Sequence, residues 1–243
     1  MDILILDFKG RLAHFRKFYT NSSSLSYSVP PRTTAVGMIA AILGMGRDSY
    51  YNLFSKENLH VGVRKLCETR RIIQSLNYMK ATSSAELISP KEHTQIPFEV
   101  ITGNKEIGYR FYISSEDKNI LDELQKRAKE NRPYYPPYFG AAPFNCLMEY
   151  VDRVDGKTNE SEDYVNISTV INQKYIKPRG INIKGKDLFL VREKMPSDFF
   201  DERIIKECSS YLFDENGGKL EVKLNCEYVN INYNGATENI LFM

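Results

Sequence analysis

The sequence predicts an α+β fold, in which helices and strands alternate along the first part of the chain and short strands follow. Three observations support this prediction. Apolar residues alternate at strand spacing in residues 3–8, apolar helical patterns lie at 34–43 and 115–132, and short alternating segments follow residue 155. With 243 residues, of which 42% are hydrophobic, the chain can bury a core of ordinary size.

Both predicted helices have recognisable ends. The helix over residues 34–43 stops at Gly44, since glycine readily adopts the left-handed conformation that closes a helix. The helix over 115–132 has one apolar stripe, and Ser115 can act as its N-cap. Further elements are expected as a short helix at 48–54 and as strands at 59–66, 109–113 and 146–154.

A long hairpin is expected between these elements. Extended segments at 70–79 and 94–102 bracket a polar stretch from 80 to 93, which predicts two paired strands with a mobile tip. Without this hairpin, the order is strand, helix, strand, strand, helix, strand. That order is typical of ferredoxin-like and RNA-recognition folds, so the hairpin is read as an insertion.

The composition suggests two units. Residues 1–154 form the predicted ferredoxin-like domain, with the hairpin inserted at about 67–102. Residues 155–243 form a small, mostly β unit that begins with a polar stretch. Its strands are expected at 164–171, 188–193 and 220–232.

Several classes of protein are disfavoured by the sequence. The longest apolar run, residues 35–43, is too short to span a bilayer, and Asp2 and Asp7 stand where a signal peptide would be basic, so we expect a cytoplasmic protein without a membrane partner. The glycines at 44–46 follow a helix, where a dinucleotide fingerprint needs a preceding strand, and we expect no cofactor.

The four cysteines do not suggest a metal site or a disulfide framework. They are far apart in sequence and form no CxxC pair, so they are expected to be small buried apolar side chains. These cysteines are Cys67, Cys146, Cys208 and Cys226.

Charge is unevenly distributed along the chain although the net charge is only +2. Cations gather at 9–17, 64–80 and 174–186, whereas acidic residues gather at 155–163 and 198–207. This pattern predicts one positive face and one neutral or negative face.

The segment 9–20 has the composition of a site for single-stranded nucleic acid. It combines cations that can follow a phosphate backbone with aromatic rings on which bases can stack, and it has no carboxylate. The helix at 34–43 follows, and its free N–H groups favour anions. The segment contributes Lys9, Arg11, His14, Phe15, Arg16, Lys17, Phe18 and Tyr19, and Pro30, Pro31, Thr33 and Thr34 open the helix.

Three stretches resemble a known family: RLAHFRKFYTNSSSLSYSVPPRTTAVGMIAAILG, HTQIPFEV and YPPYFGAAPF. They are similar to the CRISPR-associated Cascade backbone subunit that caps the 5′ end of the guide RNA, in the RAMP superfamily, and most similar to its type I-B branch. The resemblance implies a ferredoxin-like fold with a β-hairpin thumb that holds the 5′ handle of a crRNA in antiviral defence. It also implies contacts with the large subunit and the terminal copy of the repeated backbone subunit, and target DNA near the PAM is a further expected contact.

The residue pattern and the resemblance together predict an RNA-binding set. It consists of Arg16, Lys17, Tyr19, Arg32, Thr33, Thr34, Lys80, His93, Gln95 and Gly140. Structural roles remain open for the same residues: the cations can solvate a loop, Tyr19 can cover a sheet edge, Thr33 or Thr34 can cap the helix, and Gly140 can make a packing turn.

An enzyme is the main competing hypothesis. Some relatives in the superfamily cleave repeat RNA without a metal, using a histidine or tyrosine as base and a lysine to stabilise the leaving charge. His14, His93 and Lys91 are of the right types. Since the type I-B branch is expected to use a separate subunit for cleavage, we favour a non-catalytic protein. A scaffold that binds only proteins is the third hypothesis.

Overall fold

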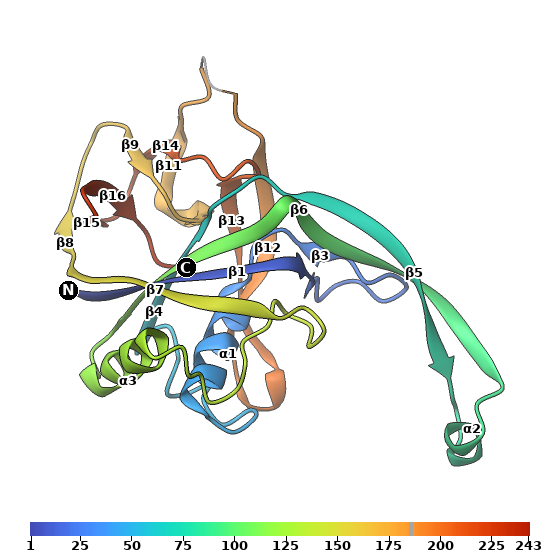
Figure 1. The fold of residues 1–243 in the computed structure, drawn as a ribbon. Coiled ribbons are helices and arrows are strands. Elements are labelled where there is room, and N and C mark those ends of the chain that lie inside the picture. Colours follow the sequence, from blue (N-terminus) through green and yellow to red (C-terminus); the bar gives the residue numbers. More distant parts are fainter. Residues whose placement is uncertain (185–186) are drawn as a thin grey trace.

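The fold is built around a central antiparallel sheet with the strand order β4-β6-β1-β7 (Figure 1). The computed structural model describes residues 1–184 and 187–243, so Lys186 of the basic stretch 174–186 lies outside the described residues. The strands of this sheet are β1 (Asp2–Ala13), β4 (Leu59–Lys65), β6 (Glu92–Ser115) and β7 (Cys146–Asp155). The helices α1 (Arg32–Leu43) and α3 (Lys118–Lys129) cover one face, and C-terminal strands cover the other.

Strand β1 is buried on both sides. Leu4, Leu6 and Phe8 belong to the core beneath α1 and α3. Ile3 and Ile5 alternate with them and pack against strands near the C-terminus. Because both faces of the sheet are covered, the strand needs apolar residues at successive positions and not only at every second one.

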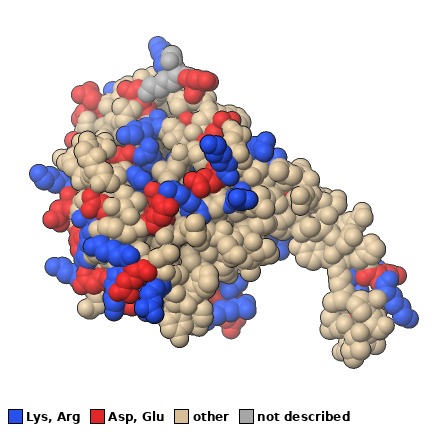
Figure 2. All heavy atoms as spheres, in the orientation of Figure 1, with Lys and Arg blue, Asp and Glu red and all other residues tan. Residues whose placement is uncertain are grey.

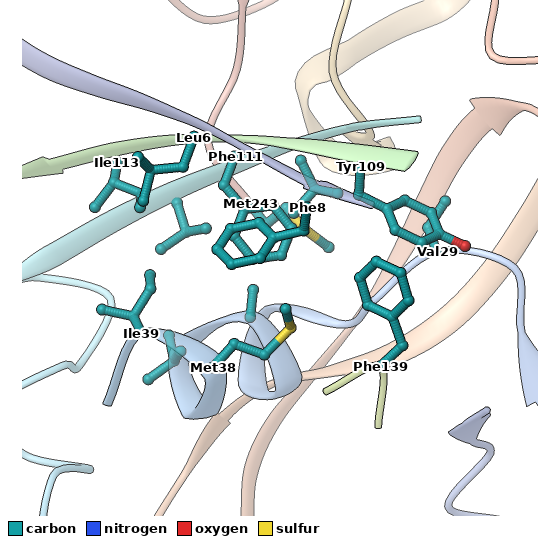
Figure 3. Packing of buried hydrophobic residues seen from close by; sticks show 14 of the residues in the cluster. Leu6, Phe8, Val29, Met38, Ile39, Tyr109, Phe111, Ile113, Phe139 and Met243 are labelled. Atoms are coloured by element: carbon teal, nitrogen blue, oxygen red, sulfur yellow. The ribbon is translucent and has the colours of Figure 1, made fainter. Parts of the chain in front are cut away.

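The main core lies between the sheet and α1 (Figure 3). The rings of Phe8 and Phe111, on neighbouring strands, have centroids 4.6 Å apart, and Ile39 of α1 faces them. Met243 inserts into the same cluster, and its N–H donates a hydrogen bond of 3.0 Å to the carbonyl of Val61. The end of the sequence is therefore held in the same core as its beginning.

Helix α1 begins at Arg32, two residues before the predicted start, and ends where expected. Its C-cap, Gly44, has φ 78°, a left-handed conformation, and its N–H donates to the carbonyls of Ala40 and Ala41. The apolar residues Val36 and Ile39 are buried, as the periodicity predicts.

Helix α3 is shorter than predicted and has a different cap. The side chain of Asp117, not that of Ser115, accepts a hydrogen bond from the N–H of Asn119. The Ser115 hydroxyl instead donates to the carbonyl of Asn58. The apolar stripe is buried as predicted and consists of Ile120, Leu121, Leu124 and Ala128.

The predicted hairpin forms an arm that leaves the body of the molecule (Figure 1). Strand β5 (Arg70–Lys80) pairs with the first half of β6 as far as Lys80 opposite Glu92. The tip contains the short helix α2 (Ser84–Ile88), which Ser83 caps by accepting from the N–H of Glu86. The second half of the arm and the next predicted strand are one continuous strand, β6.

The prediction of a short helix at 48–54 is wrong. Asp48 has φ 62°, which no regular helix contains, and only a single helical turn follows, closed by the Phe54 N–H and the Tyr50 carbonyl at 2.8 Å. The segment is therefore a series of turns that packs beside the start of α1.

Beyond residue 155, the described part of the chain forms two further sheets. One has the order β11-β14-β9-β16-β15-β8 and the other β10-β13-β12, while β2 and β3 form a small pair near the N-terminus. Their bounds are β2 (Phe15–Arg16), β3 (Ser26–Tyr27), β8 (Lys157–Asn159), β9 (Val165–Ile167), β10 (Ile171–Asn172), β11 (Ile176–Ile181), β12 (Leu190–Phe199), β13 (Ile205–Asp214), β14 (Leu220–Leu224), β15 (Tyr228–Tyr233) and β16 (Ala236–Ile240). Short 3-10 turns lie at Gln173–Tyr175 and Asp201–Arg203.

The hairpin β12–β13 is longer than the strand predicted at 188–193, and it reaches α1. Met195, Tyr211 and Phe213 belong to the main core with the residues of α1. The tip of this hairpin, around Arg203, therefore lies beside the first turns of α1 and helps to build the site described next.

Candidate nucleic-acid interface

A cavity of about 380 Å³ opens at the N-terminal end of α1. Segments that are distant in sequence line it: the β2–β3 region, the start of α1, the loop before β7 and the tip of the β12–β13 hairpin. Among the predicted RNA-binding residues, the fold brings Arg16, Thr33, Thr34 and Gly140 to this cavity.

The helix start is open toward the cavity. Pro31 occupies the N-cap position, and no side chain of the described residues caps the helix there. The N–H groups of Thr34 and Ala35 both donate to the Pro31 carbonyl, at 2.9 and 3.0 Å. Thr33 and Thr34 are half-buried residues within the first turn, so the capping role left open for them is not observed. The positive end of the helix dipole thus adjoins the cavity.

A second hollow adjoins the first and shares several of its walls. Tyr50, Tyr138 and Arg203 line both, above the small side of α1 formed by Gly37 and Ala41. We call the two hollows together the α1 groove. Flat rings above a floor of small residues leave room for a planar group, and they can stack on it.

Several residues of this groove give little signal in the sequence. Tyr50, Tyr51, Phe199 and Arg203 line it but were not predicted, and Tyr138 was noted only as part of an aromatic loop. The aromatic pair after α1 was a usable signal. Arg203 lies within a stretch dominated by acidic residues, where the composition gives no indication of a binding cation.

Arg16 lines the groove, whereas Tyr19 is outside the lining and contacts Phe18, which lines it. Arg16 is exposed and makes one long contact, 3.4 Å, from Nη2 to the carbonyl of Thr20. The Tyr19 ring is exposed and packs edge-on against Phe18, with centroids 5.2 Å apart. Both side chains are accessible to a ligand.

Two predicted RNA contacts are corrected by the structure. Arg32 is buried, and its guanidinium donates to the carbonyls of Phe54, Leu59 and Ser197, with the Asp198 carboxylate 3.6 Å away. Arg32 is the first residue of α1, and its side chain points toward β12, whereas Thr33 and Thr34 face the groove. A guanidinium enclosed in this way is not presented to RNA.

Lys17 is the second correction. Its ammonium lies 2.6 Å from the Glu193 carboxylate and 5.3 Å from the centroid of the Tyr27 ring, and the residue is buried. A cation and a carboxylate that share a buried site satisfy each other. Lys17 therefore ties the β2 segment to β12.

Gly140 lines the cavity, but close packing explains why this position requires glycine. It has φ 80°, and a Cβ there would lie 2.2 Å from the His14 carbonyl oxygen. Its N–H already donates to the carbonyl of Tyr138 at 3.0 Å. The expected approach of this amide to a phosphate is therefore not available in this conformation.

The remaining predicted residues lie on the arm, away from the α1 groove. Lys80 pairs with the Glu92 carboxylate at 2.9 Å, and His93 and Gln95 stand opposite Met79 and Asn77 in the ladder. All three predicted side chains are exposed. The fold separates them from Arg16 and the start of α1.

His14, a candidate base for RNA cleavage, is enclosed by the protein. Nδ1 donates to the Glu99 carbonyl at 2.7 Å, Nε2 accepts from the Ser24 hydroxyl at 3.0 Å, and the ring stacks on Phe98 with centroids 4.0 Å apart. Burial lowers the pKa of His14 from its ordinary value. The other candidates, His93 and Lys91, lie on the arm and not beside His14.

Charged side chains of both signs share the face of the molecule that Figure 2 shows. On the face shown in Figure 2, Lys and Arg mix with Asp and Glu over the body, whereas the arm carries charged side chains mainly near its tip. Within residues 1–184 and 187–243, no cluster of His, Cys, Asp or Glu has the makings of a metal site. None of the helices in those same ranges is both long and apolar enough to cross a bilayer.

Comparison with known proteins supports the family assignment. Residues 3–208 match the sequence profile of the family described as CRISPR-associated protein (Cas_Cas5). No curated protein sequence matches the chain.

Solved structures share the fold at low sequence identity. A CRISPR protein from Archaeoglobus fulgidus is 12% identical, with a TM-score of 0.58 over 98% of this chain and 99% of that one. A chain of a CRISPR RNA-guided surveillance complex is 14% identical, with a TM-score of 0.51 over 91% of both chains. A chain of the Type III-B Cmr-beta complex bound to cognate target RNA and AMPPnP is 14% identical, with a TM-score of 0.50 over 89% of this chain and 86% of that one. Because the profile match spans most of the sequence, the chain belongs to the CRISPR-associated Cas_Cas5 family.

Proposed function

We propose that this protein is a non-catalytic RNA-binding subunit of a type I CRISPR effector complex, and that it holds the 5′ handle of the crRNA in the α1 groove. The observation that carries the proposal is the convergence of separate segments on one groove. Arg16, the first turn of α1 and the loop containing Gly140 were each selected from sequence, and the fold places them around one cavity.

The chemistry of the groove suits an unpaired ribonucleotide segment. Arg16 and Arg203 supply positive charge, and the rings of Tyr50 and Tyr138 offer surfaces for bases. Stacking on an aromatic side chain is worth roughly 1–3 kcal/mol per base, and it requires bases that are not paired. The open end of α1 adds N–H groups that favour phosphate.

The family and the sheet order support the remainder of the proposal. The chain order β1-α1-β4-β6-α3-β7 and the sheet order β4-β6-β1-β7 agree with a ferredoxin-like domain, and the β5–β6 arm corresponds to its inserted thumb. We assign the protein to the type I-B-like branch in the cytoplasm. Its proposed partners are the large subunit, the repeated backbone subunit and target DNA near the PAM.

The proposal that the protein is not an enzyme draws on the surroundings of His14. Both ring nitrogens are already hydrogen-bonded to protein groups, and burial lowers its pKa. A general base must reach the proton that it removes. His14 would have to leave both partners to do so.

Binding of a repeat-derived RNA tests the proposal. A labelled single strand of the handle sequence should bind the wild-type protein with an affinity that falls as salt rises, because bound cations release counterions. Arg16→Ala should weaken binding by roughly 1 kcal/mol, about fivefold in Kd, and should reduce the salt slope by about one. Fluorescence anisotropy at several salt concentrations measures both quantities.

Arg192→Ala is the matched control, because it removes the same charge from an exposed position on β12 outside the groove lining. The control should bind as wild type, and the RNA should be recovered intact in the presence of a chelator. Equal salt slopes for wild type and Arg16→Ala, or no binding by either, would refute the assignment of the groove.

A further inference from the structure

Arg203 reaches the α1 groove from the opposite half of the sequence. It lines both hollows, and its Nε donates to Oδ1 of Asp48 at 2.8 Å. Asp48 also accepts from the Tyr51 hydroxyl and from Nε of Arg47. The Arg203 side chain remains 54% exposed, so it is held in place without being enclosed.

The orientation of Arg203 leaves its outer edge available to a ligand. The bond to Asp48 uses Nε, so the edge formed by the two Nη groups is the part that can donate two parallel hydrogen bonds to a phosphate. Asp48 is itself fixed through Tyr51, whose ring packs edge-on against Phe199 with centroids 5.7 Å apart. A carboxylate supported in this way can set the direction of the guanidinium.

Three residues at the same contact have strained backbone conformations. Asp48, Glu202 and Arg203 have φ values of 62°, 58° and 61°, a region that residues other than glycine rarely adopt. Such strain persists where the surrounding structure requires it and is often found at ligand clamps. Here it places Arg203 at the junction of the two hollows.

We propose that Arg203 is a phosphate-binding residue of the α1 groove and that Asp48 is its positioning residue, an inference that rests on the proposed RNA-binding function. Arg203 then acts on the same strand as Arg16 but from the opposite wall, which the β12–β13 hairpin provides. The groove is therefore completed by the C-terminal half of the chain.

Substitution of Arg203 tests the binding role. Arg203→Ala should weaken binding of the labelled handle RNA roughly fivefold and reduce the salt slope by about one, as expected for the loss of one phosphate contact. Arg192→Ala again serves as the control, and the thermal midpoints of both variants should match wild type, since both side chains are exposed.

Substitution of Asp48 gives a test in which the direction of the change in RNA affinity decides between two effects. Removal of a negative charge near the groove would by itself tighten RNA binding, whereas loss of the positioning contact weakens it. We expect Asp48→Asn to weaken binding roughly threefold, within the coupling range for residues in contact. Asp48→Glu should recover part of this loss, and Asp48→Asn should cause no further loss when combined with Arg203→Ala.

The outcomes separate this inference from the proposed function. If wild type binds the RNA and Arg16→Ala weakens it, but Arg203→Ala binds as wild type, the role of Arg203 is overturned and the proposed function stands. Tighter binding by Asp48→Asn overturns the positioning role alone. If wild type does not bind the handle RNA, the proposed function and this inference both fall.

Discussion

At the scale of single residues, two arginines with similar sequence context have opposite environments. Arg16 and Arg32 both flank the segment that leads into α1, and both fit a phosphate-binding pattern. Arg16 is exposed beside the groove, whereas Arg32 is enclosed and satisfies three backbone carbonyls. The difference arises because the direction of a side chain depends on what the helix packs against, which no local pattern contains.

His14 provides a residue-scale prediction about pH. Burial lowers the pKa values of His14 and His60 from the ordinary 6.5, so the unfolded chain binds protons more readily than the folded one. The free energy of unfolding should therefore decrease as pH falls through about 6.5, and continue to decrease until the folded-state histidines titrate. Urea unfolding at pH 7.5 and 5.5 measures this decrease.

The variant His14→Gln isolates the contribution of that residue. It should be less stable than wild type at pH 7.5 but should lose less stability on acidification, with His60 accounting for the rest. Carboxylates such as Asp2 and Glu238 have lowered pKa values, so they titrate below this interval. An identical pH dependence in the variant and wild type would contradict the assignment.

At the scale of elements, the arm differs from the rest of the fold because it has no core of its own. Every residue from 77 to 95 is exposed or half-buried, and burial begins only at the base with Phe98, which stacks on His14. A two-stranded hairpin alone is marginally stable in water. The stability of the arm is therefore expected to depend on the packing at its base, whereas the stability of the body is not expected to depend on the arm.

Shortening the arm tests this prediction. Residues 77–95 can be replaced by an Asn-Gly turn, because Leu76 and Ile96 are cross-strand partners. The thermal midpoint should remain at the wild-type value. Phe98→Ala is the contrasting change, and it should lower stability by about 3 kcal/mol because it empties a packed site at the base. A large drop in the midpoint of the shortened protein would show that the outer arm supports the body.

At the scale of the whole molecule, the N-terminal sheet is completed by the C-terminal strands. Ile3, Ile5 and Tyr112 face Ile231 and its neighbours, and Met243 enters the core on the other side of the sheet. An ion pair also joins the two predicted units, since Arg64 pairs with Glu238. The two units predicted from composition therefore share buried surfaces in the folded chain.

A fragment of residues 1–154 tests how far the first unit depends on the second. Without the later strands, one face of the central sheet would expose apolar residues, and burial of such residues is the main source of stability. The fragment should show no cooperative thermal transition and weak near-ultraviolet dichroism, whereas the full chain should show both. A cooperative transition in the fragment would support two independent units instead.

Features of the fold that depend on local patterns could be predicted from the sequence. Strand β1, helix α1 with its Gly44 cap, the buried stripe of α3 and the position of the hairpin all follow from periodicity and from the conformations that glycine permits. The sequence also predicted an RNA-binding set, and four of its members line the α1 groove: Arg16, Thr33, Thr34 and Gly140.

Long-range packing determines which side chains complete the groove and which are withdrawn from it. Lys17 is held by Glu193, 176 positions away, and Arg203 meets Asp48 across 155 positions. Such contacts arise from the packing of β12 and β13 against α1. Closing so long a loop costs conformational entropy, and the burial of apolar residues elsewhere in the core offsets this cost. A local window of sequence contains neither partner's position, so the direction of these charges is a property of the assembled fold.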